Sequence, residues 1–376
     1  MHVLYASHRY HPVPGGTERL VQTIAEGAAK RGHEVTVVTQ REPGAPFEEV
    51  IGGVRVVRLR VVRAFGIRWP RDYISFLRRS RADVFHAFGN RIWCVDFYLP
   101  RARGFRWPQL LSGLGFYQYA MHPNLFDRLY FERYFPRAAR RFDRYVALTD
   151  READQMTRWG FPRERILRLP TGVDLSEFAA GAPRVDVTRA AWGLTAPQVA
   201  VYAGGFFDNK RVDRLIQAAA LRRGSWGVVL IGRDMPESPC SIAATQALAS
   251  RLGVEVRFPG VLPRAAVIQS LFAADAVVLG SEYEGYGLLL LEAMAAGRPF
   301  VSFDAGAAPE LASTGAGFSV SSVEEFAGRL ELLEDSAVRT QVGSLGLRRV
   351  TEFSQDRLVD RHLEAYQALI QDRSRG

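Results

Sequence analysis

Two residue types are scarce in this chain of 376 residues, and each scarcity narrows what the protein can be. Cysteine occurs only at Cys94 and Cys240. These two fall in different predicted domains and lack metal-ligand spacing, so we expect reduced thiols rather than a disulfide framework or a zinc site. Lysine occurs only at Lys30 and Lys210, although the chain carries 49 basic residues. Nearly all of the positive charge is therefore arginine.

Long apolar runs are also missing. No stretch reaches the roughly 18 apolar residues that a membrane-spanning helix needs. Residues 3–6 are apolar, but no basic region precedes them and the run is short, so no signal peptide is expected. Together with the reduced cysteines, these absences predict a cytoplasmic protein, with peripheral attachment at the inner face of the membrane left open.

The charge is uneven along the chain. Residues 1–175 contain 29 Lys and Arg against 17 Asp and Glu, a net of +12, whereas the remainder has 20 against 23, a net of −3. A basic half can attract nucleic acid, anionic lipid or a phosphorylated acceptor. A general preference for arginine explains the excess equally well. Residues 105–107 and 130–144 mix aromatic residues with arginine, as an interfacial segment would.

Strand and helix patterns alternate throughout, which indicates an α/β protein with parallel sheets. In the first half, strands are expected at residues 3–7, 35–40, 54–61, 84–88, 109–112, 145–149 and 166–169, and the clearest helix at 17–31. A second series has strands at 199–203, 227–231, 254–258, 276–279 and 300–303. Its helices are expected at 212–222, 242–252, 264–273, 288–296 and 323–333. We predict two doubly wound domains facing each other across a cleft at the carboxyl ends of their strands.

The domain boundaries follow from composition. Residues 179–197 are rich in Ala, Gly and Pro and predict a linker. An N-terminal domain is therefore expected over residues 1–178 and a C-terminal domain over 198–350. The last segment, 351–376, is expected to be helical and to pack back on the first domain.

The most informative stretch is residues 281–287, Ser-Glu-Tyr-Glu-Gly-Tyr-Gly, which follows a short apolar strand and leads into a helix. That helix is apolar on every side except for Glu292, so it is expected to be buried. A buried carboxylate needs a partner. The helix N-terminus offers backbone N–H groups to an anion such as a diphosphate. The alternative is that Glu284 caps the helix and Glu292 meets a structural arginine.

The spacing of Glu284 and Glu292, with Gly-Tyr-Gly between them, resembles the E-x7-E signature of retaining glycosyltransferases of the GT-B fold, most of all family 4. Residues 201–211 resemble the glycine-rich loop of that family's donor domain. There Lys210 matches the family lysine, whereas Gly205 stands in place of an arginine. Both cations hold the departing diphosphate in the family, so Arg211, Arg214 and Arg233 are the residues that can compensate.

The resemblance implies a donor site in the second domain. Glu284 would bind hydroxyls of the transferred sugar, Glu292 those of the ribose, and Lys210 the diphosphate. Glu284 and Lys210 are therefore the expected catalytic residues. The full set expected around the donor is Gly204, Gly205, Lys210, Arg211, Gly232, Phe258, Gly260, Val261, Glu284, Gly285, Tyr286, Gly287, Leu288 and Glu292. Residues 305–310 resemble a further family turn, G-G-x-x-E.

In the first domain, Gly15-Gly16-Thr17-Glu18 resembles the family's G-G-x-E loop on the acceptor side, and an ordinary capped turn is the alternative. His86 matches a family histidine at a strand end, with a structural role as the alternative. Gly113 and Leu114 lie in a loop where many members carry a histidine. This chain has Gly-Leu-Gly there, similar to bacterial polysaccharide and lipid-linked oligosaccharide transferases. His122, a few residues further on, is a less favoured replacement for the missing histidine.

The resemblance implies transfer of a hexosyl or N-acetylhexosaminyl group from a nucleotide-diphosphate sugar to a hydroxyl acceptor, with retention, in polysaccharide, glycolipid or lipid-linked glycan synthesis. No cofactor or metal is expected, and nucleic acid is not an expected partner because no binding signature accompanies the basic half. Two alternatives stay open. One is an epimerase or hydrolase of the same fold, and the other is a basic nucleic-acid-binding protein.

Overall fold

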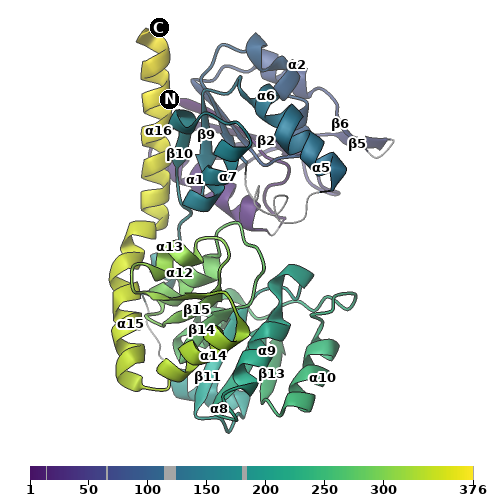
Figure 1. Ribbon diagram of the computed structural model, residues 1–376. Helices are drawn as coiled ribbons and strands as arrows, with labels where there is room; N and C mark the ends of the chain where they lie inside the picture. Colours follow the sequence, from purple (N-terminus) through teal and green to yellow (C-terminus); the bar gives the residue numbers. More distant parts are fainter. Residues whose placement is uncertain (14, 65–66, 114–123, 180–183, 376) are drawn as a thin grey trace. The chain divides into compact units, whose positions relative to one another are not determined.

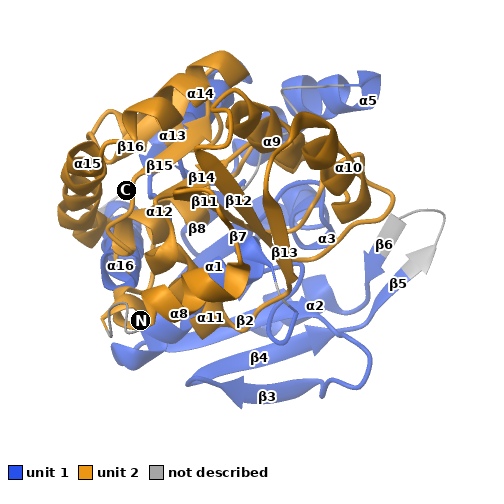
Figure 2. Ribbon diagram, turned by 90° about the horizontal axis from the view of Figure 1, so that it is seen from below, with its two compact units in different colours: residues 1–171, 355–376 blue, residues 172–354 orange. Residues whose placement is uncertain are grey.

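A computed structural model describes residues 1–13, 15–64, 67–113, 124–179 and 184–375. The chain divides into two units: unit 1 comprises residues 1–171 and 355–376, and unit 2 comprises residues 172–354 (Figure 2). The division after residue 171 falls seven residues before the expected end of the first domain at 178. Among the described residues, no helix has both the length and the apolar character that crossing a bilayer requires.

Unit 1 is built on an eight-stranded sheet in the order β10-β9-β8-β7-β1-β2-β4-β3. Its neighbours are parallel except for β3, which pairs with β4 in antiparallel register. The strands are β1 (His2–Ala6), β2 (Glu34–Gln40), β3 (Glu48–Ile51), β4 (Val54–Leu59), β7 (Val84–Phe88), β8 (Gln109–Ser112), β9 (Arg144–Ala147) and β10 (Ile166–Arg168). A separate hairpin joins β5 (Val61–Ala64) to β6 (Ile67–Pro70).

The helices of unit 1 cover this sheet (Figure 1). They are α1 (Gly16–Lys30), α2 (Tyr73–Arg79), α3 (Trp93–Asp96), α5 (Leu125–Arg128), α6 (Phe135–Ala139), α7 (Asp150–Arg158) and the C-terminal α16 (Gln355–Arg375). Short segments η1 (Leu99–Gly104), η2 (Leu129–Tyr134) and η3 (Arg163–Arg165) lie between them. Helix α16 packs beside α1, where Arg31 pairs with Asp356 at 3.0 Å and Asp360 at 2.9 Å.

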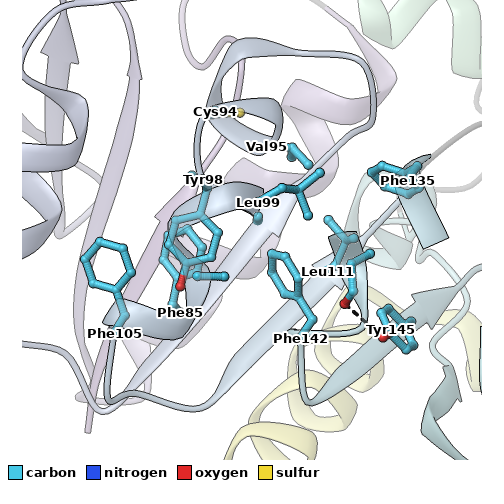
Figure 3. Close-up of a cluster of buried hydrophobic side chains, with 14 of the residues drawn as sticks. Phe85, Cys94, Val95, Tyr98, Leu99, Phe105, Leu111, Phe135, Phe142 and Tyr145 are labelled. Atoms are coloured by element: carbon cyan, nitrogen blue, oxygen red, sulfur yellow. Dashed lines mark hydrogen bonds between the residues drawn. The ribbon is translucent and has the colours of Figure 1, made fainter. Parts of the chain in front are cut away.

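Aromatic side chains dominate the core of unit 1 (Figure 3). Phe105 stacks on Trp107 at 4.9 Å between ring centroids, and Phe85 stacks on Tyr98 at 4.4 Å. Phe105 is 7% exposed and Trp107 is 8% exposed. The suggestion that residues 105–107 meet a membrane is therefore wrong, because burying these rings in the core removes them from any interface.

Unit 2 is built on a six-stranded parallel sheet in the order β13-β12-β11-β14-β15-β16. Its strands are β11 (Gln198–Ala203), β12 (Trp226–Ile231), β13 (Val256–Gly260), β14 (Ala276–Leu279), β15 (Phe300–Phe303) and β16 (Gly317–Val320). The four strands β11, β12, β14 and β15 are buried almost throughout, as expected for a sheet covered on both faces.

The helices of unit 2 are α8 (Val185–Trp192), α9 (Val212–Ala220), α10 (Ile242–Leu252), α11 (Arg264–Ala273), α12 (Leu288–Ala295), α13 (Ala308–Ala312), α14 (Val323–Leu332) and α15 (Ser336–Arg349). Its short helical segments are η4 (Leu175–Phe178), η5 (Asp208–Lys210) and η6 (Val350–Phe353). Local signals set their ends: Ser241 caps α10, and Gly253 ends it with φ of 69°. Helix α8 lies inside the expected linker. Gly193 ends that helix in the left-handed conformation, and Trp192 is buried.

Candidate active site

In the sheet of unit 2, the order in which successive strands are added reverses between β11 and β14. β12 and β13 extend to one side of this pair and β15 and β16 to the other. In open α/β sheets such a switch point separates the loops at the carboxyl ends of the strands and leaves room for a ligand. The loop after β11 carries Lys210, and the loop after β14 carries Glu284. Two sequence-predicted residues therefore flank the same switch point.

Lys210 and Glu284 are in direct contact. The Nζ atom of Lys210 donates to Oε1 of Glu284 at 2.5 Å, and Ser281 Oγ donates to the same oxygen at 2.6 Å. The side chains of Lys210 and Glu284 are only 22% and 13% exposed. In the described part of the chain, no donor reaches the second carboxylate oxygen of Glu284. A cation and a carboxylate are thus held side by side with little access to water, which strengthens their interaction with a bound ligand.

The two loops also interlock through their backbones. The N–H of Glu282 donates to the carbonyl of Asn209 at 2.8 Å, and Asn209 Nδ2 donates to the carbonyl of Tyr283 at 3.2 Å. These bonds fix Lys210 and Glu284 on neighbouring rigid turns. Asn209 and Ser281 were missed from the sequence, because a single polar residue in a loop carries no pattern that distinguishes it.

Helix α12 begins immediately after this loop. Gly287 precedes it with φ of 94°, and the helix residues Leu289, Leu290 and Leu291 are buried. No protein acceptor among the described residues takes the N–H groups of Gly285, Gly287 or Leu288. Tyr286 is buried, and its carbonyl accepts from the N–H of Ala307 at 2.8 Å. The start of α12 thus presents open N–H groups beside Lys210 and Glu284.

Glycines allow the strand-end loops to meet closely. Gly306, with φ of 56°, lies so near the Glu284 loop that a Cβ atom would come within 2.5 Å of the carbonyl of Tyr286 and 2.8 Å of Glu284 Cβ. Gly232 has φ of 148°, and a Cβ there would collide with the carbonyl of Gly204. The turn at residues 305–310 and the end of β12 therefore contribute to the same edge.

Glu292 forms an ion pair inside unit 2. Arg264 Nη1 donates to Glu292 Oε1 at 2.6 Å, and Arg264 Nη2 donates to Glu177 Oε2 at 2.7 Å. Burial by itself lowers the pKa of Arg264, but the two carboxylates outweigh it, and the net shift is upward. The arginine that the sequence analysis offered as an alternative partner of Glu292 is thus present. It lies 28 residues from Glu292 and 87 from Glu177, separations that no sequence pattern marks.

Position 205 lies against a movable side chain. A Cβ at Gly205 would lie 2.6 Å from the ring of Phe207, which is 47% exposed and has room to move. Of the three arginines that can compensate, Arg211 is held by both oxygens of Asp213 at 3.0 and 2.9 Å. Arg214 lies over the ring of Phe303 at 4.7 Å.

Arg233 is the third of these arginines, and its side chain is exposed. It forms no ion pair within the described residues. Its carbonyl accepts from the N–H of Phe206 at 3.0 Å, which places it next to the Gly204–Gly205 turn. Arg233 therefore lies at this edge with an exposed side chain, whereas Arg211 is held by Asp213.

The remaining predicted donor residues lie at the far side of this edge. Gly260 ends β13, and its carbonyl accepts from the N–H of Gly232 at 2.9 Å. Phe258 packs edge-on against the buried Phe206 with ring centroids 6.2 Å apart. Val261 follows and is 71% exposed. The three residues lie at the carboxyl end of β13, next to β12.

Unit 1 has its own switch point, between β1 and β7. The loop after β1 leads to Gly15, Gly16, Thr17 and Glu18 at the start of α1, where the carboxylate of Glu18 folds over Gly15 and leaves no room for a Cβ. Gly16 is exposed. These four residues lie at the edge where the acceptor is expected. Leu114, also expected there, is outside the described residues, as is His122.

Three residues that were not predicted connect the loops at this edge. Trp93 Nε1 donates to His8 Nδ1 at 2.9 Å, which ties the loop after β7 to the loop after β1. Asn90 Nδ2 donates to the carbonyl of Gly113 at 2.5 Å, which ties it to the end of β8. Gly113 therefore belongs to the same edge as the loop that begins with Asn90.

His86 is placed differently from the expectation of an acceptor-side residue. It is fully buried in the middle of β7, with Nδ1 2.8 Å from Tyr366 Oη and Nε2 2.8 Å from Ser112 Oγ. Burial, and to a smaller extent His362, holds the pKa of His86 well below its usual value. With both ring nitrogens next to protein hydroxyls, His86 joins α16 to the sheet.

The described residues hold no group of three or more His, Cys, Asp and Glu side chains that could bind a metal ion. The edge of unit 2 offers a lysine, arginines, open N–H groups and two carboxylates. Such a set suits a ligand that carries phosphates at one end and hydroxyls at the other.

Comparison with known proteins agrees with this arrangement. Residues 14–177 match the family described as Glycosyltransferase Family 4, and residues 186–344 match the family described as Glycosyl transferases group 1. The chain belongs to glycosyltransferase family 4. The family signature Glu284–Glu292 and Lys210 of this family 4 protein lie in the second matched segment.

Two curated relatives are similar in sequence. A D-inositol 3-phosphate glycosyltransferase from Kineococcus radiotolerans is 31% identical over 258 residues, which cover 62% of this chain and 58% of the relative. An alpha-D-kanosaminyltransferase from Streptomyces kanamyceticus is 27% identical over 331 residues, which cover 79% of this chain and 83% of the relative. The chain thus spans less than two thirds of the first relative's length.

Solved structures confirm the fold. HepE from Anabaena, crystallised with UDP-glucose, superimposes with a TM-score of 0.77 at 19% identity, covering 98% of this chain and 100% of that protein. At this identity the likeness establishes the GT-B fold, with its two Rossmann-like domains, and nothing about the ligand. The predicted fold class is therefore confirmed.

Proposed function

We propose that this family 4 protein transfers a hexosyl or N-acetylhexosaminyl group from a nucleotide-diphosphate sugar to a hydroxyl acceptor, with retention at the anomeric carbon. The observation that carries the proposal is the contact of Lys210 with Glu284 at 2.5 Å beside the open N–H groups of α12. In a sugar diphosphate the phosphates and the sugar hydroxyls lie next to each other. A cation that binds the phosphates and a carboxylate that binds the hydroxyls therefore suit this ligand when they are adjacent.

The diphosphate would lie against Lys210 and the N–H groups of Gly285, Gly287 and Leu288. These groups stabilise the negative charge that develops as the bond between the anomeric carbon and the phosphate oxygen breaks. Arg233 would supply the second cation in place of the family arginine missing at Gly205. Its exposed guanidinium is not committed to a carboxylate, in contrast to that of Arg211.

The carboxylates would bind the hydroxyl groups. Glu284 offers its second oxygen to the transferred sugar while Lys210 and Ser281 hold the first. Glu292 would accept from the ribose hydroxyls, with Arg264 and Glu177 fixing its position. Phe258, Gly260 and Val261 would lie beside the nucleobase.

The reaction proposed is front-face attack. The acceptor oxygen forms a bond to the anomeric carbon on the face that the diphosphate leaves, and the acceptor proton passes to the departing phosphate oxygen. No cofactor or metal takes part in this scheme. The acceptor would bind at the edge of unit 1 that carries Gly15 to Glu18 and Gly113. The UDP-glucose bound to HepE and the phosphorylated polyol named for the Kineococcus relative support UDP-sugars and polyhydroxylated acceptors as the first compounds to test.

Thermal-shift screening against a panel of nucleotide sugars tests the donor, because a ligand that binds only the folded state raises the melting temperature. The stabilising donor is then incubated with candidate acceptors, and NMR identifies the anomeric configuration of the product. Retention with an acceptor-dependent product is expected. Release of free sugar or an epimer without any acceptor would instead support the hydrolase or epimerase alternative. We place the enzyme in the cytoplasm, in agreement with two free buried cysteines.

A further inference from the structure

A helical segment of unit 1, residues 125–139, is made of α5, η2 and α6 (Figure 1). It exposes large apolar side chains. Phe126 is 80% exposed, Leu125 is 72% exposed and Leu129 is 54% exposed. Tyr134, on the same segment, is 46% exposed. Scattered apolar residues on a surface are ordinary, but three within five positions form a patch that marks an interaction site.

The opposite face of the segment is firmly packed. Asp127, Phe131 and Phe135, spaced four residues apart, are buried, and Phe131 stacks on Trp159 at 5.0 Å. Asn124 caps α5 by accepting from the N–H of Asp127 at 2.8 Å. With its inner face held in the core, the segment cannot turn Leu125, Phe126 and Leu129 inward. Their exposure is a fixed property of unit 1.

Positive charges outnumber negative charges around this patch. Arg128, Arg133, Arg137 and Arg140 are exposed, and none forms an ion pair within the described residues. Glu132 is the single exposed acid of the segment. Exposed apolar residues bordered by unpaired arginines complement a surface that is anionic outside and apolar beneath. An identical face of a second copy would bring like charges together, which disfavours self-association through it.

We propose that the outward face of residues 125–140 docks on an anionic lipid bilayer. Leu125, Phe126 and Leu129 enter the boundary between head groups and acyl chains, and the four arginines contact lipid phosphates. Of the two segments that the sequence suggested, 105–107 is excluded because its aromatic residues are buried, whereas 130–144 overlaps this surface and supplies Arg133, Arg137 and Arg140.

The docking segment is tied to the acceptor edge of unit 1. Asp127 pairs with Arg91, and Tyr130 donates to Asp96. Arg91 and Asp96 flank Trp93 in the segment directly after β7, where Asn90 contacts Gly113. Resting on the proposed transferase function, this connection assigns the acceptor to a membrane-presented class, a hydroxyl on a lipid-linked molecule.

Vesicle flotation tests the docking surface. The full chain is mixed with vesicles of phosphatidylcholine alone or with phosphatidylglycerol added. We expect flotation only with the anionic lipid, and a loss of roughly tenfold or more in the L125S/F126S variant, since about two buried apolar side chains are removed. The R133Q/R137Q variant should bind more weakly and depend less on salt, because two of the four arginines remain. The matched controls are Val187→Ser and Arg251→Gln, which are exposed on unit 2, and both should float like the parent protein.

Two results would overturn the proposal: no flotation with anionic vesicles, or equal flotation of the parent and L125S/F126S proteins. A parent dimer that the same variant converts to a monomer, without vesicle binding, would instead assign the patch to self-association and also overturn it. Flotation needs no sugar donor, and L125S/F126S should keep its transfer rate with a water-soluble acceptor. A failure of lipid binding is therefore distinguishable from a failure of the proposed reaction.

Discussion

Lys210 Nζ lies 2.5 Å from Glu284 Oε1, and the two residues come from loops that follow the adjacent strands β11 and β14. They are 74 residues apart in the chain, yet the switch point of the sheet brings them together. The proposed donor site depends on this pair, and the following changes test its parts.

The two lysines of the chain provide a direct comparison. Lys210→Ala should lower kcat/KM for transfer by roughly 100-fold or more, because a cation facing the departing diphosphate is lost. Lys30→Ala removes the other, exposed lysine at the end of α1 and should leave the rate unchanged. Initial-rate kinetics with saturating acceptor measures both. Equal rates for Lys210→Ala and the parent enzyme would rule out this role for Lys210.

Glu292 and Glu177 both pair with Arg264, but only Glu292 is a proposed donor contact. Comparing variants of the two residues therefore distinguishes a structural role from donor binding. Glu292→Gln should weaken donor binding by about 10- to 100-fold, the usual effect of losing a hydrogen bond to a charged group. Glu177→Gln weakens the contacts of the same arginine with residue 177, at 2.7 and 2.9 Å, but removes no proposed donor contact. Calorimetry with the donor found by screening should show near-normal affinity for Glu177→Gln. Affinity that falls equally in both variants would assign Glu292 to structure alone.

Glu284 should matter for transfer more than for stability. Glu284→Ala should reduce transfer by at least about 100-fold, because the sugar loses a hydroxyl contact and Lys210 loses its partner. Ser281→Ala removes only the hydrogen bond at 2.6 Å to Glu284 and should cost less, about tenfold. Melting temperatures of both variants should stay close to the parent value. A Glu284→Ala enzyme with normal turnover would remove the residue from the mechanism.

The missing family arginine gives a rescue experiment. Arg233→Ala should weaken binding of the nucleoside diphosphate by about tenfold, as expected for one charged hydrogen bond. Gly205→Arg restores the family residue, and the exposed Phe207 ring can turn aside to admit it. The double variant G205R/R233A should therefore regain affinity. Arg251→Ala is the control for an exposed arginine remote from this edge. Unchanged binding in Arg233→Ala would leave the second cation unassigned.

Buried histidines make unit 1 sensitive to acid. Burial lowers the pKa of His362 to about 4 and that of His86 well below its usual value. Histidines of the unfolded chain titrate near about pH 6.5. Between about pH 6.5 and 4 the unfolded chain therefore binds more protons, and the free energy of unfolding falls as the pH is lowered through this window.

Urea unfolding at about pH 7.5 and about pH 5 measures this effect. The free energy of unfolding should differ between the two pH values by about 2 kcal/mol less in His362→Gln than in the parent protein, because one buried histidine is removed. His11→Gln, at an exposed position, should behave like the parent protein. If the free energy of unfolding changed by the same amount between the two pH values in all three proteins, the assignment of acid sensitivity to His362 would be contradicted.

Much of the fold could be predicted from the sequence because its central strands are continuous apolar runs. Strands β7, β8, β14 and β15 have the predicted bounds, 84–88, 109–112, 276–279 and 300–303. Strands β3 and β16 were missed, as were β5 and β6 of the separate hairpin. Strand β3 contains two glutamates and lies at the edge of its sheet, and β16 is a short run that begins with glycine. Edge strands are only partly buried, so their composition carries little signal.

The site could be predicted only in part. Lys210, Glu284 and Glu292 were found because rarity and spacing mark them in the sequence. Arg264 and Glu177 were not, because folding alone brings them to Glu292. His86 matched a family position, yet its burial and its two hydroxyl partners became apparent only with α16 in place beside β7.

A crystal structure with the nucleoside diphosphate of the stabilising donor tests the central claim most directly. We predict diphosphate oxygens within hydrogen-bonding distance of Lys210 Nζ and of the N–H groups of Gly287 and Leu288, with the ribose hydroxyls at Glu292. Density for the nucleotide elsewhere, with the start of α12 covered by protein side chains, would contradict the account.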